Sequence, residues 1–330
     1  MSPTLDARSP AEYAQAHLPG AVNVPLLNDE QRHRIGITYK EQGRDAAVLL
    51  GFDLVGPRFG ELVRSARALA GSQRDVQVYC WRGGMRSQIL GWVLQLAGFR
   101  VRILPGGYKA WRNNLLLRCG EPRKLIVLGG RTGSGKTELL HHLAAQGEQV
   151  IDLEGLAHHK GSAFGALGEP PQPSHEQFEN LVALAWCNTD PERAVWMENE
   201  SRSIGRVKLP DAVYNHLRNA PVVEAVVPID VRKQRILETY GTFSAKELSD
   251  CTRQLAKRLG GLRLQEAMSA LEEDRRDEWL DILLGYYDKT YDHGNSQRSP
   301  SSIHPLELSP GESHAAFADR LADHVKKLIL

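Results

Sequence analysis

A cysteine and two arginines lie together in a short glycine-containing segment, Cys80-Trp81-Arg82-Gly83-Gly84-Met85-Arg86-Ser87. It follows the apolar run 76–79 and precedes a helix-like stretch. Backbone N–H groups in such a loop point at the cysteine sulfur, which favours its thiolate and binds anions. Glycine lets the backbone curl without a clashing Cβ. We therefore predict catalytic roles for Cys80, Arg82 and Arg86, and an anion-binding role for Gly83, Gly84 and Ser87.

The spacing of this loop leaves several chemistries open. Cys80 and Arg86 fit Cys-x5-Arg, the pattern of cysteine phosphatases, whereas many sulfur-transferring rhodaneses have a loop one residue shorter. The phosphatase pattern usually has histidine before the cysteine, and Tyr79 stands there. The loop could hold an anionic sulfur species or a tetrahedral oxyanion. A phosphatase and an inactive, structural cysteine loop remain alternatives.

A second chemical motif follows the buried strand predicted at 124–129 and precedes a helix at 138–145. It is a full Gly-x4-Gly-Lys-Thr match, whose backbone N–H groups cradle phosphates while the lysine neutralises charge. The predicted diphosphate-binding residues are Gly130, Arg131, Thr132, Gly133, Ser134, Gly135, Lys136 and Thr137. The motif does not distinguish between ligands, because ATP, GTP and a prenyl diphosphate all carry phosphates that this loop could bind. Thr137 could also ligate Mg²⁺, although the sequence leaves the metal unknown.

Acidic residues end two further predicted strands, 149–155 and 194–202. We predict that Glu198 or Glu200 could hold a Mg²⁺ shell, and that the following residues surround the phosphate loop: Asp152, Glu154, Glu198, Glu200 and Arg202. Alternatively, these side chains are ordinary solvated residues at the protein surface. The neighbouring His158 and His159 do not predict a metal site, because adjacent residues do not face one point in regular structure.

Strands that alternate with amphipathic segments predict an α/β fold. We expect a first α/β domain over residues 1–120 and a phosphate-loop domain with a parallel sheet over 121–330, helical in its C-terminal part. The first strand is expected to be short, because only four residues precede Leu5. Helices are expected to begin at Ser9, Ser87 and Pro105, and a polar loop at 294–302 to precede a closing helix at 313–330.

Basic residues gather in one predicted helix, Ser244–Leu259. Residues 253, 257 and 258 neighbour one another on a single helix, so we predict that Arg253, Lys257 and Arg258 contact the phosphates of an RNA. Alternatively, these residues form a solvated helix face. The same alternative holds for the basic residues at 232–235. The whole-chain net charge of +1 gives no nucleic-acid signal of its own.

Composition favours an ordinary globular protein of 330 residues with 42% hydrophobic content. No apolar run approaches the roughly 20 residues of a membrane span, and the start lacks the zones of a signal peptide. The four cysteines form no Cys-x-x-Cys pair, which argues against a zinc ribbon or redox dithiol. Reduced thiols without an export signal predict a cytoplasmic protein and no membrane contact.

The motifs together resemble the tRNA 2-selenouridine synthase family, in which a rhodanese domain is fused to a P-loop domain. The resemblance covers nearly the whole chain. Besides the two motifs, it rests on Asn28-Asp29-Glu30, Gly36, Tyr39-Lys40, Gly43, Gly106-Gly107-Tyr108-Lys109, residues 152–157, Gly161-Ser162-Ala163-Phe164-Gly165 and residues 200–205.

The resemblance implies that wobble 2-thiouridine of tRNA becomes 2-selenouridine. Geranyl diphosphate would first alkylate the sulfur, and selenophosphate would then supply selenium while geranylthiol departs. Cys80 would handle selenium, the P-loop would hold the prenyl donor, and an enzyme that supplies selenophosphate could be a partner. A P-loop kinase or ATPase with a regulatory rhodanese domain and a non-catalytic RNA-binding adapter are the alternatives.

Overall fold

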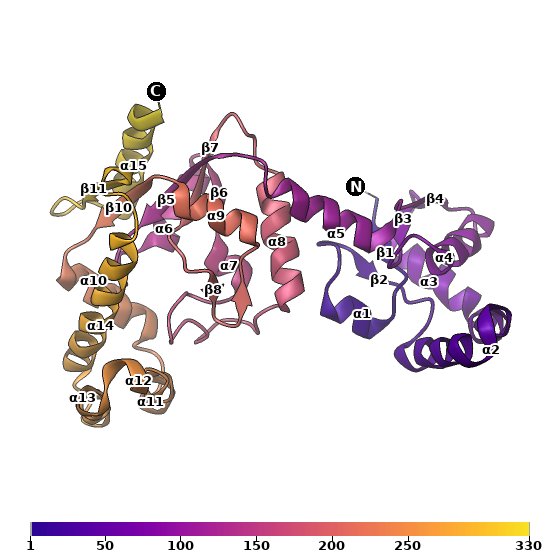
Figure 1. Ribbon diagram of the computed structural model, residues 1–330, viewed down its shortest axis with the longest axis horizontal. Helices are drawn as coiled ribbons and strands as arrows, with labels where there is room; N and C mark the ends of the chain where they lie inside the picture. The colour runs from indigo at the N-terminus through magenta and orange to yellow at the C-terminus, as the bar shows by residue number, and fades with distance from the viewer. Residues whose placement is uncertain (1, 330) are drawn as a thin grey trace. The chain divides into compact units, whose positions relative to one another are not determined.

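The computed structural model describes residues 2–329. The chain divides into two compact units, one formed by residues 2–118 with Glu179–Leu181, the other by residues 119–178 and 182–329. The boundary expected from the sequence lay between residues 120 and 121. Each unit has its own parallel sheet, and helices dominate the C-terminal part (Figure 1). The predicted α/β class is therefore confirmed.

Unit 1 is built on a parallel sheet of order β2-β1-β3-β4. Its strands are β1 (Thr4–Asp6), β2 (Val22–Asn23), β3 (Asp75–Tyr79) and β4 (Arg100–Ile103). Its helices are α1 (Pro10–Gln15), α2 (Asp29–Val55), the 3₁₀ turn η1 (Gly56–Arg58), α3 (Phe59–Ala70), α4 (Met85–Leu96) and α5 (Gly107–Arg118). No helix or strand was predicted from the sequence for residues 29–70, where α2, η1 and α3 lie. In α2 only Ala47 and Val55 are buried, so this helix lacks the apolar stripe that periodicity detects.

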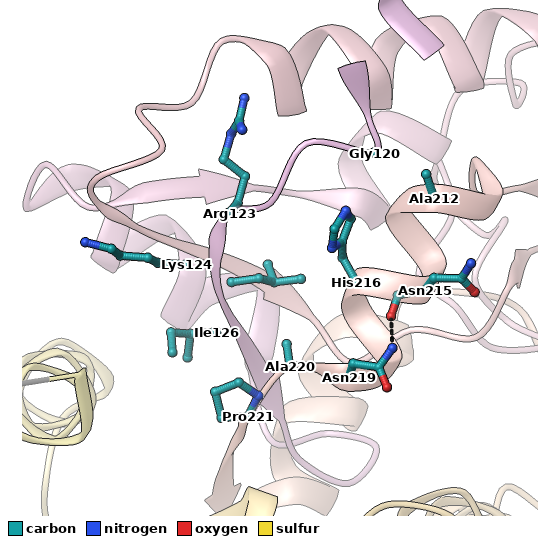
Figure 2. Close-up of a pocket in the computed structure, with 11 residues that line it drawn as sticks. Gly120, Arg123, Lys124, Ile126, Ala212, Asn215, His216, Asn219, Ala220 and Pro221 are labelled. Atoms are coloured by element: carbon teal, nitrogen blue, oxygen red, sulfur yellow. Dashed lines mark hydrogen bonds between the residues drawn. The ribbon is translucent and has the colours of Figure 1, made fainter. Parts of the chain in front are cut away.

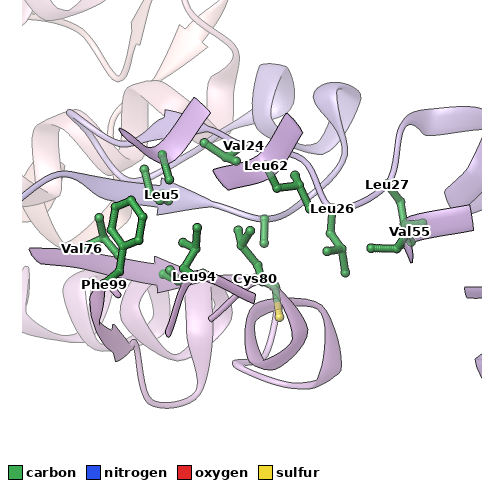
Figure 3. Packing of buried hydrophobic residues seen from close by; sticks show 14 residues of the cluster. Leu5, Val24, Leu26, Leu27, Val55, Leu62, Val76, Cys80, Leu94 and Phe99 are labelled. Carbon is green, nitrogen blue, oxygen red and sulfur yellow. The ribbon is translucent and has the colours of Figure 1, made fainter. Parts of the chain in front are cut away.

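An apolar cluster lies beneath the strands of unit 1. Figure 3 shows Leu5, Val76, Leu94 and Phe99 packed together, with Cys80 in the same cluster. The cysteine therefore begins its loop from a position fixed by core packing.

A buried ion pair links β1 to its neighbours. The Asp6 carboxylate accepts hydrogen bonds from Arg8, with Oδ2 2.6 Å from Nη2, and both side chains are buried. Arg8 also donates to the Ala16 carbonyl at 2.6 Å, and its guanidinium lies 4.2 Å from the ring centroid of Tyr108. One arginine thus joins the end of β1, the end of α1 and the start of α5.

Unit 2 has a parallel sheet of order β11-β10-β5-β7-β6, so the strand before the phosphate loop is central. The strands are β5 (Lys124–Gly129), β6 (Gln149–Ile151), β7 (Ala194–Glu198), β10 (Val222–Val226) and β11 (Ile303–Glu307), with a small hairpin of β8 (Ser203–Ile204) and β9 (Val207–Lys208). The helices are α6 (Lys136–Ala145), α7 (Leu153–Ala157), α8 (His175–Cys187), α9 (Asp211–Asn219), α10 (Ile229–Tyr240), α11 (Ala245–Arg253), α12 (Ala256–Leu259), α13 (Gly261–Glu272), α14 (Arg276–Ser296), the 3₁₀ turn η2 (Pro300–Ser302) and α15 (His314–Ile329). Figure 1 shows α11, α12 and α13 gathered near α14.

Several expected boundaries in unit 2 are wrong. The strand predicted for 149–155 ends at Ile151, because Asp152 accepts the Gly155 N–H at 2.7 Å and caps α7. The expected polar loop 294–302 begins as the last turn of α14, and edge strand β11 follows it. The expected closing helix is confirmed as α15. Over the described residues 2–329, no helix has both the length and the apolar character needed to cross a membrane.

Replacing Asp6 by Ala should destabilise unit 1 strongly. The change would leave the Arg8 guanidinium buried without its partner, which costs about 3–5 kcal/mol. Urea unfolding of the full chain, followed by circular dichroism, measures the effect. Asp75→Ala is the control, because the Asp75–Arg100 pair is solvent-exposed and should contribute little. Equal midpoints for the two variants would contradict the role given to the buried pair.

Candidate functional site

The Cys80 loop runs from the end of β3 to the start of α4. The Cys80 side chain is only 4% exposed, and its Sγ lies 3.3 Å from Ser87 Oγ and 3.8 Å from the Gly84 carbonyl oxygen. Ser87 Oγ donates to the same carbonyl at 3.0 Å. The structure thus brings together Cys80, Gly84 and Ser87, three of the residues predicted for this site.

The first residues of α5 hold the backbone of this loop through hydrogen bonds. The Tyr108 N–H donates to the Cys80 carbonyl at 2.9 Å, and the Lys109 N–H donates to the Trp81 carbonyl at 3.0 Å. Gly107 has φ +61°, and a Cβ there would collide with the Cys80 carbonyl oxygen and the Gly83 nitrogen. Only glycine fits this position without strain.

The two arginines of the loop have different surroundings. Arg86 forms a two-pronged ion pair with Glu12, with Nη2 3.2 Å from Oε1. Burial raises the pKa of Glu12, but the hydrogen bond and charge of Arg86 outweigh this and lower it. Arg82 is exposed and forms no ion pair within residues 2–329. Arg82 is therefore the uncommitted cation of the loop.

The phosphate loop joins β5 to α6, as predicted. Lys136 Nζ donates to the Gly130 carbonyl at 2.9 Å, and Gly133 and Gly135 have φ of +84° and +78°. The Arg131 side chain does not join this group, because it pairs with Asp292 at 3.0 Å.

Acidic side chains meet beside the loop. Thr137 Oγ1 donates to Glu154 Oε2 at 2.8 Å. A Cβ on Gly161 would lie 2.8 Å from Glu200 Oε1 and 3.1 Å from Glu154 Oε1, so both carboxyls approach this glycine. Burial and the Glu154 charge raise the pKa of Glu200 to about 8, although the Lys136 ammonium opposes them. This group of charges responds to pH in the neutral to alkaline range.

The other predicted acidic-cluster residues divide into buried and exposed positions. Glu198 is fully buried and accepts the Leu153 N–H at 2.9 Å. Burial, then the charges of Asp152 and Glu154, raise its pKa well above the usual value. Arg202 instead is exposed and pairs with Asp211 at the start of α9. No cluster of three or more His, Cys, Asp or Glu side chains suited to a metal occurs among residues 2–329.

A cavity of about 1140 Å³ opens beside the phosphate loop. Its polar end includes Lys136, Thr137, Glu154 and Glu200. The rest of the lining mixes polar residues such as Asn199, Thr239 and Arg258 with an apolar and aromatic wall, and α14 supplies most of that wall. The wall includes Phe164, Tyr240, Trp279, Leu283, Tyr286 and Tyr287. One cavity therefore combines a phosphate-binding end with a hydrocarbon-like wall.

Figure 2 shows another hollow, of about 680 Å³, at the amino end of β5. Arg123, Lys124, His216 and Asn219 are among its lining residues. Ligands of open parallel sheets bind at the carboxyl ends of the strands, where the phosphate loop lies. We therefore locate the chemistry of unit 2 in the larger cavity.

Comparison with known proteins decides between the alternatives. The family model described as the tRNA 2-selenouridine synthase AAA domain matches residues 123–307, and the rhodanese-like domain model matches residues 2–114. The chain belongs to the tRNA 2-selenouridine synthase family. It is therefore an enzyme of this type, a transferase that combines a rhodanese-like domain with a P-loop domain.

Relatives named tRNA 2-selenouridine synthase match along most of their length. The protein of Nitrosomonas europaea is 36% identical, over 90% of this chain and 90% of its own. That of Sulfurovum sp. is 38% identical, over 92% and 91%. That of Chromohalobacter salexigens is 36% identical, over 96% and 93%. The similarity spans both units, as the sequence resemblance implied.

The premise for the predicted tRNA-binding residues is wrong. Residues 244–259 do not form one helix, because α11 ends at Arg253 and α12 begins at Ala256. Arg253 pairs with Asp250, whereas Arg258 donates to the Tyr286 hydroxyl at 3.1 Å and lines the large cavity. The three basic residues therefore do not share one helical stripe.

The basic stretch at the start of α10 is also not a solvated face. Arg232 is buried and donates to the Thr132 carbonyl at 3.0 Å and to Asp288. Lys233 pairs with Asp281, and Arg235 pairs with Glu138. These cations support the phosphate loop and its surroundings, a role that the sequence analysis missed.

Glu200 should make the stability of this family member depend on pH. In the folded protein the pKa of Glu200 is about 8, above its usual 4.5. The folded state therefore binds the proton more tightly than the unfolded state, and this stabilisation is fully present below about pH 4.5. That contribution is lost as pH rises through about 8. Glu200→Gln stays neutral, so its melting temperature should fall less than that of the wild type between about pH 6 and pH 9.

Differential scanning fluorimetry in metal-free buffer tests this expectation. Glu192→Gln is the matched control, because the Glu192 side chain is 84% exposed. Its pH profile should follow the wild type. Parallel profiles for Glu200→Gln and the wild type would show that Glu200 titrates in its ordinary range.

Proposed function

We propose that this enzyme converts wobble 2-thiouridine of tRNA into 2-selenouridine through an S-geranyl intermediate. In the first step the thiouridine sulfur bonds to C1 of geranyl diphosphate, the C1–O bond breaks, and pyrophosphate and one proton leave. In the second step selenium from selenophosphate bonds to C2 of the base and geranylthiol leaves. Water takes up the phosphoryl group as phosphate. Alkylation makes the sulfur a better leaving group, so the first step prepares C2 of the base for substitution by selenium.

The apolar wall of the P-loop cavity is the observation that carries this proposal. Tyr240, Tyr286 and Tyr287 are partly exposed and offer aromatic surface over which a hydrocarbon tail can pack. Buried Trp279 and Leu283 lie behind them. Burial contributes about 0.8 kcal/mol per CH₂ group. A diphosphate at Lys136 with its prenyl tail along α14 would use both ends of the cavity.

The Cys80 loop suits the selenium step. Its backbone turn and the N-terminus of α4 favour an anion, and Arg82 adds an uncommitted positive charge. We assign selenophosphate to this loop and selenium handling to Cys80. A selenophosphate-producing enzyme is the proposed source of the donor.

Basic residues of unit 2 are proposed to contact tRNA, and oxygen ligands beside the phosphate loop could bind a metal ion. We retain Arg253, Lys257 and Arg258 as proposed phosphate contacts, now as separate sites rather than one face. A tRNA substrate places the proposed reaction in the cytoplasm. If Mg²⁺ accompanies the diphosphate, Thr137 and Glu154 offer neighbouring oxygen ligands beside the loop.

Mass spectrometry of wobble nucleosides tests the proposal as a whole. The enzyme is incubated with thiolated tRNA, geranyl diphosphate and selenophosphate, with each donor omitted in turn. S-Geranyl-2-thiouridine should accumulate without selenophosphate, and 2-selenouridine should require both donors. ATP turnover without tRNA, and no modified nucleoside, would instead identify a P-loop ATPase.

Cys80→Ser should block selenium insertion and largely spare geranylation, because the prenyl diphosphate has its own loop in unit 2. Single-turnover assays of the two products measure the separation. Cys187→Ser is the control and should leave both steps unchanged. Wild-type yields of 2-selenouridine from Cys80→Ser would remove this residue from the reaction.

Lys136→Ala should weaken the use of geranyl diphosphate far more than tRNA binding. Loss of one charge-assisted phosphate contact should cost about 1.5–3 kcal/mol, roughly tenfold or more in affinity. Geranylation rates at limiting donor measure this loss. Lys124→Ala, at the other end of β5, should behave as the wild type. Unchanged kinetics for Lys136→Ala would exclude the P-loop from donor binding.

A further inference from the structure

The Cys80 loop exposes an aromatic side chain at the residue that follows its buried cysteine. Trp81 is 37% exposed, whereas Cys80 is almost fully covered. We propose that Trp81 is a stacking platform that receives the wobble nucleobase of tRNA at the selenium step. This inference rests on the proposed function and adds a binding site for the base within unit 1.

The ring of Trp81 is supported from inside the unit. Its centroid lies 5.5 Å from that of Tyr108, at an interplanar angle of 35°. Tyr108 is fully buried and packs in turn against the Arg8 guanidinium, which Asp6 holds. A chain of packed groups therefore connects the exposed indole to the buried ion pair. An aromatic ring that is already fixed loses little conformational freedom when a base stacks on it.

The backbone of the loop is fixed as well. The first residues of α5 donate hydrogen bonds to the carbonyls of Cys80 and Trp81, at 2.9 and 3.0 Å. The cysteine and the aromatic residue are thus held by consecutive N–H groups at the start of one helix. Their relative positions are set before any substrate arrives.

A single-stranded RNA base is the ligand that these groups fit. Proteins recognise unpaired loop bases by stacking them on aromatic rings and by placing arginine at the adjoining backbone. Arg82 follows Trp81 directly, is exposed, and has no ion-pair partner within the described chain. Arg86 is already committed to Glu12. Trp81 and Arg82 therefore form the substrate-facing part of the loop, with Arg82 beside a phosphate.

The test uses an anticodon stem-loop RNA that carries S-geranyl-2-thiouridine, together with selenophosphate. Trp81→Ala and Trp81→Leu should lower kcat/KM for selenation by roughly 5- to 100-fold, mostly through KM for the RNA. Trp81→Phe should restore most of the activity, because it keeps an aromatic face. Geranylation of the unmodified thiolated RNA should stay at the wild-type rate in all three variants.

Trp92→Ala is the matched control. Trp92 is 53% exposed on α4 of the same unit but is not in the Cys80 loop. Its substitution should change neither step. Equal losses for Trp81→Ala and Trp92→Ala would overturn the platform and indicate general destabilisation.

Three further outcomes would also overturn the stacking platform. Full activity of Trp81→Leu would show that bulk, not an aromatic face, is needed. Weaker binding of selenophosphate by Trp81→Ala, with an unchanged KM for RNA, would make Trp81 part of the donor site. Wild-type kinetics in Trp81→Ala, with Cys80→Ser still inactive, would refute stacking but leave the proposed function standing. A wild-type enzyme without 2-selenouridine product would refute the proposed function itself.

Discussion

Both reactive loops depend on backbone turns that leave no room for a side chain. In unit 1 a Cβ on Gly107 would occupy the place of the Cys80 carbonyl and the Gly83 nitrogen. In unit 2 a Cβ on Gly133 would lie 2.8 Å from the Arg232 carbonyl oxygen. The backbone can follow these paths only because glycine accepts positive φ at both points. The two glycines thus set the course of the chain beside both predicted anion sites.

The sequence predicted the strands and loops whose structure follows from residues that are close together in the chain. Buried strands such as 124–129 and the glycine-rich loop after it have a pattern that few other structures share. The same holds for Cys80 with Gly83 and Gly84. The resemblance to a known family then joined the two motifs, and the comparisons confirmed that family. Helices without an apolar stripe, such as α2, gave no comparable signal.

Partners that are distant in sequence could not be predicted in this way. Glu12 neutralises Arg86 across 74 positions of the chain, and the aromatic wall of the cavity comes from α14, far beyond the phosphate loop. The break between α11 and α12 also escaped prediction, because a capping box at Ser244 indicates where a helix begins and not where it ends. Tertiary packing determines all three features.

Helix α14 touches the phosphate loop as well as the apolar wall. The Tyr291 hydroxyl accepts the Gly130 N–H at 2.7 Å, and Asp288 holds Arg232, which donates to the Thr132 carbonyl. The same helix carries Leu283 and Tyr287 of the wall. A displacement of α14 therefore moves both ends of the cavity together. Thermodynamic linkage makes such coupling reciprocal: whatever factor a phosphate group adds to the affinity for a hydrocarbon tail, the tail adds to the affinity for the phosphate.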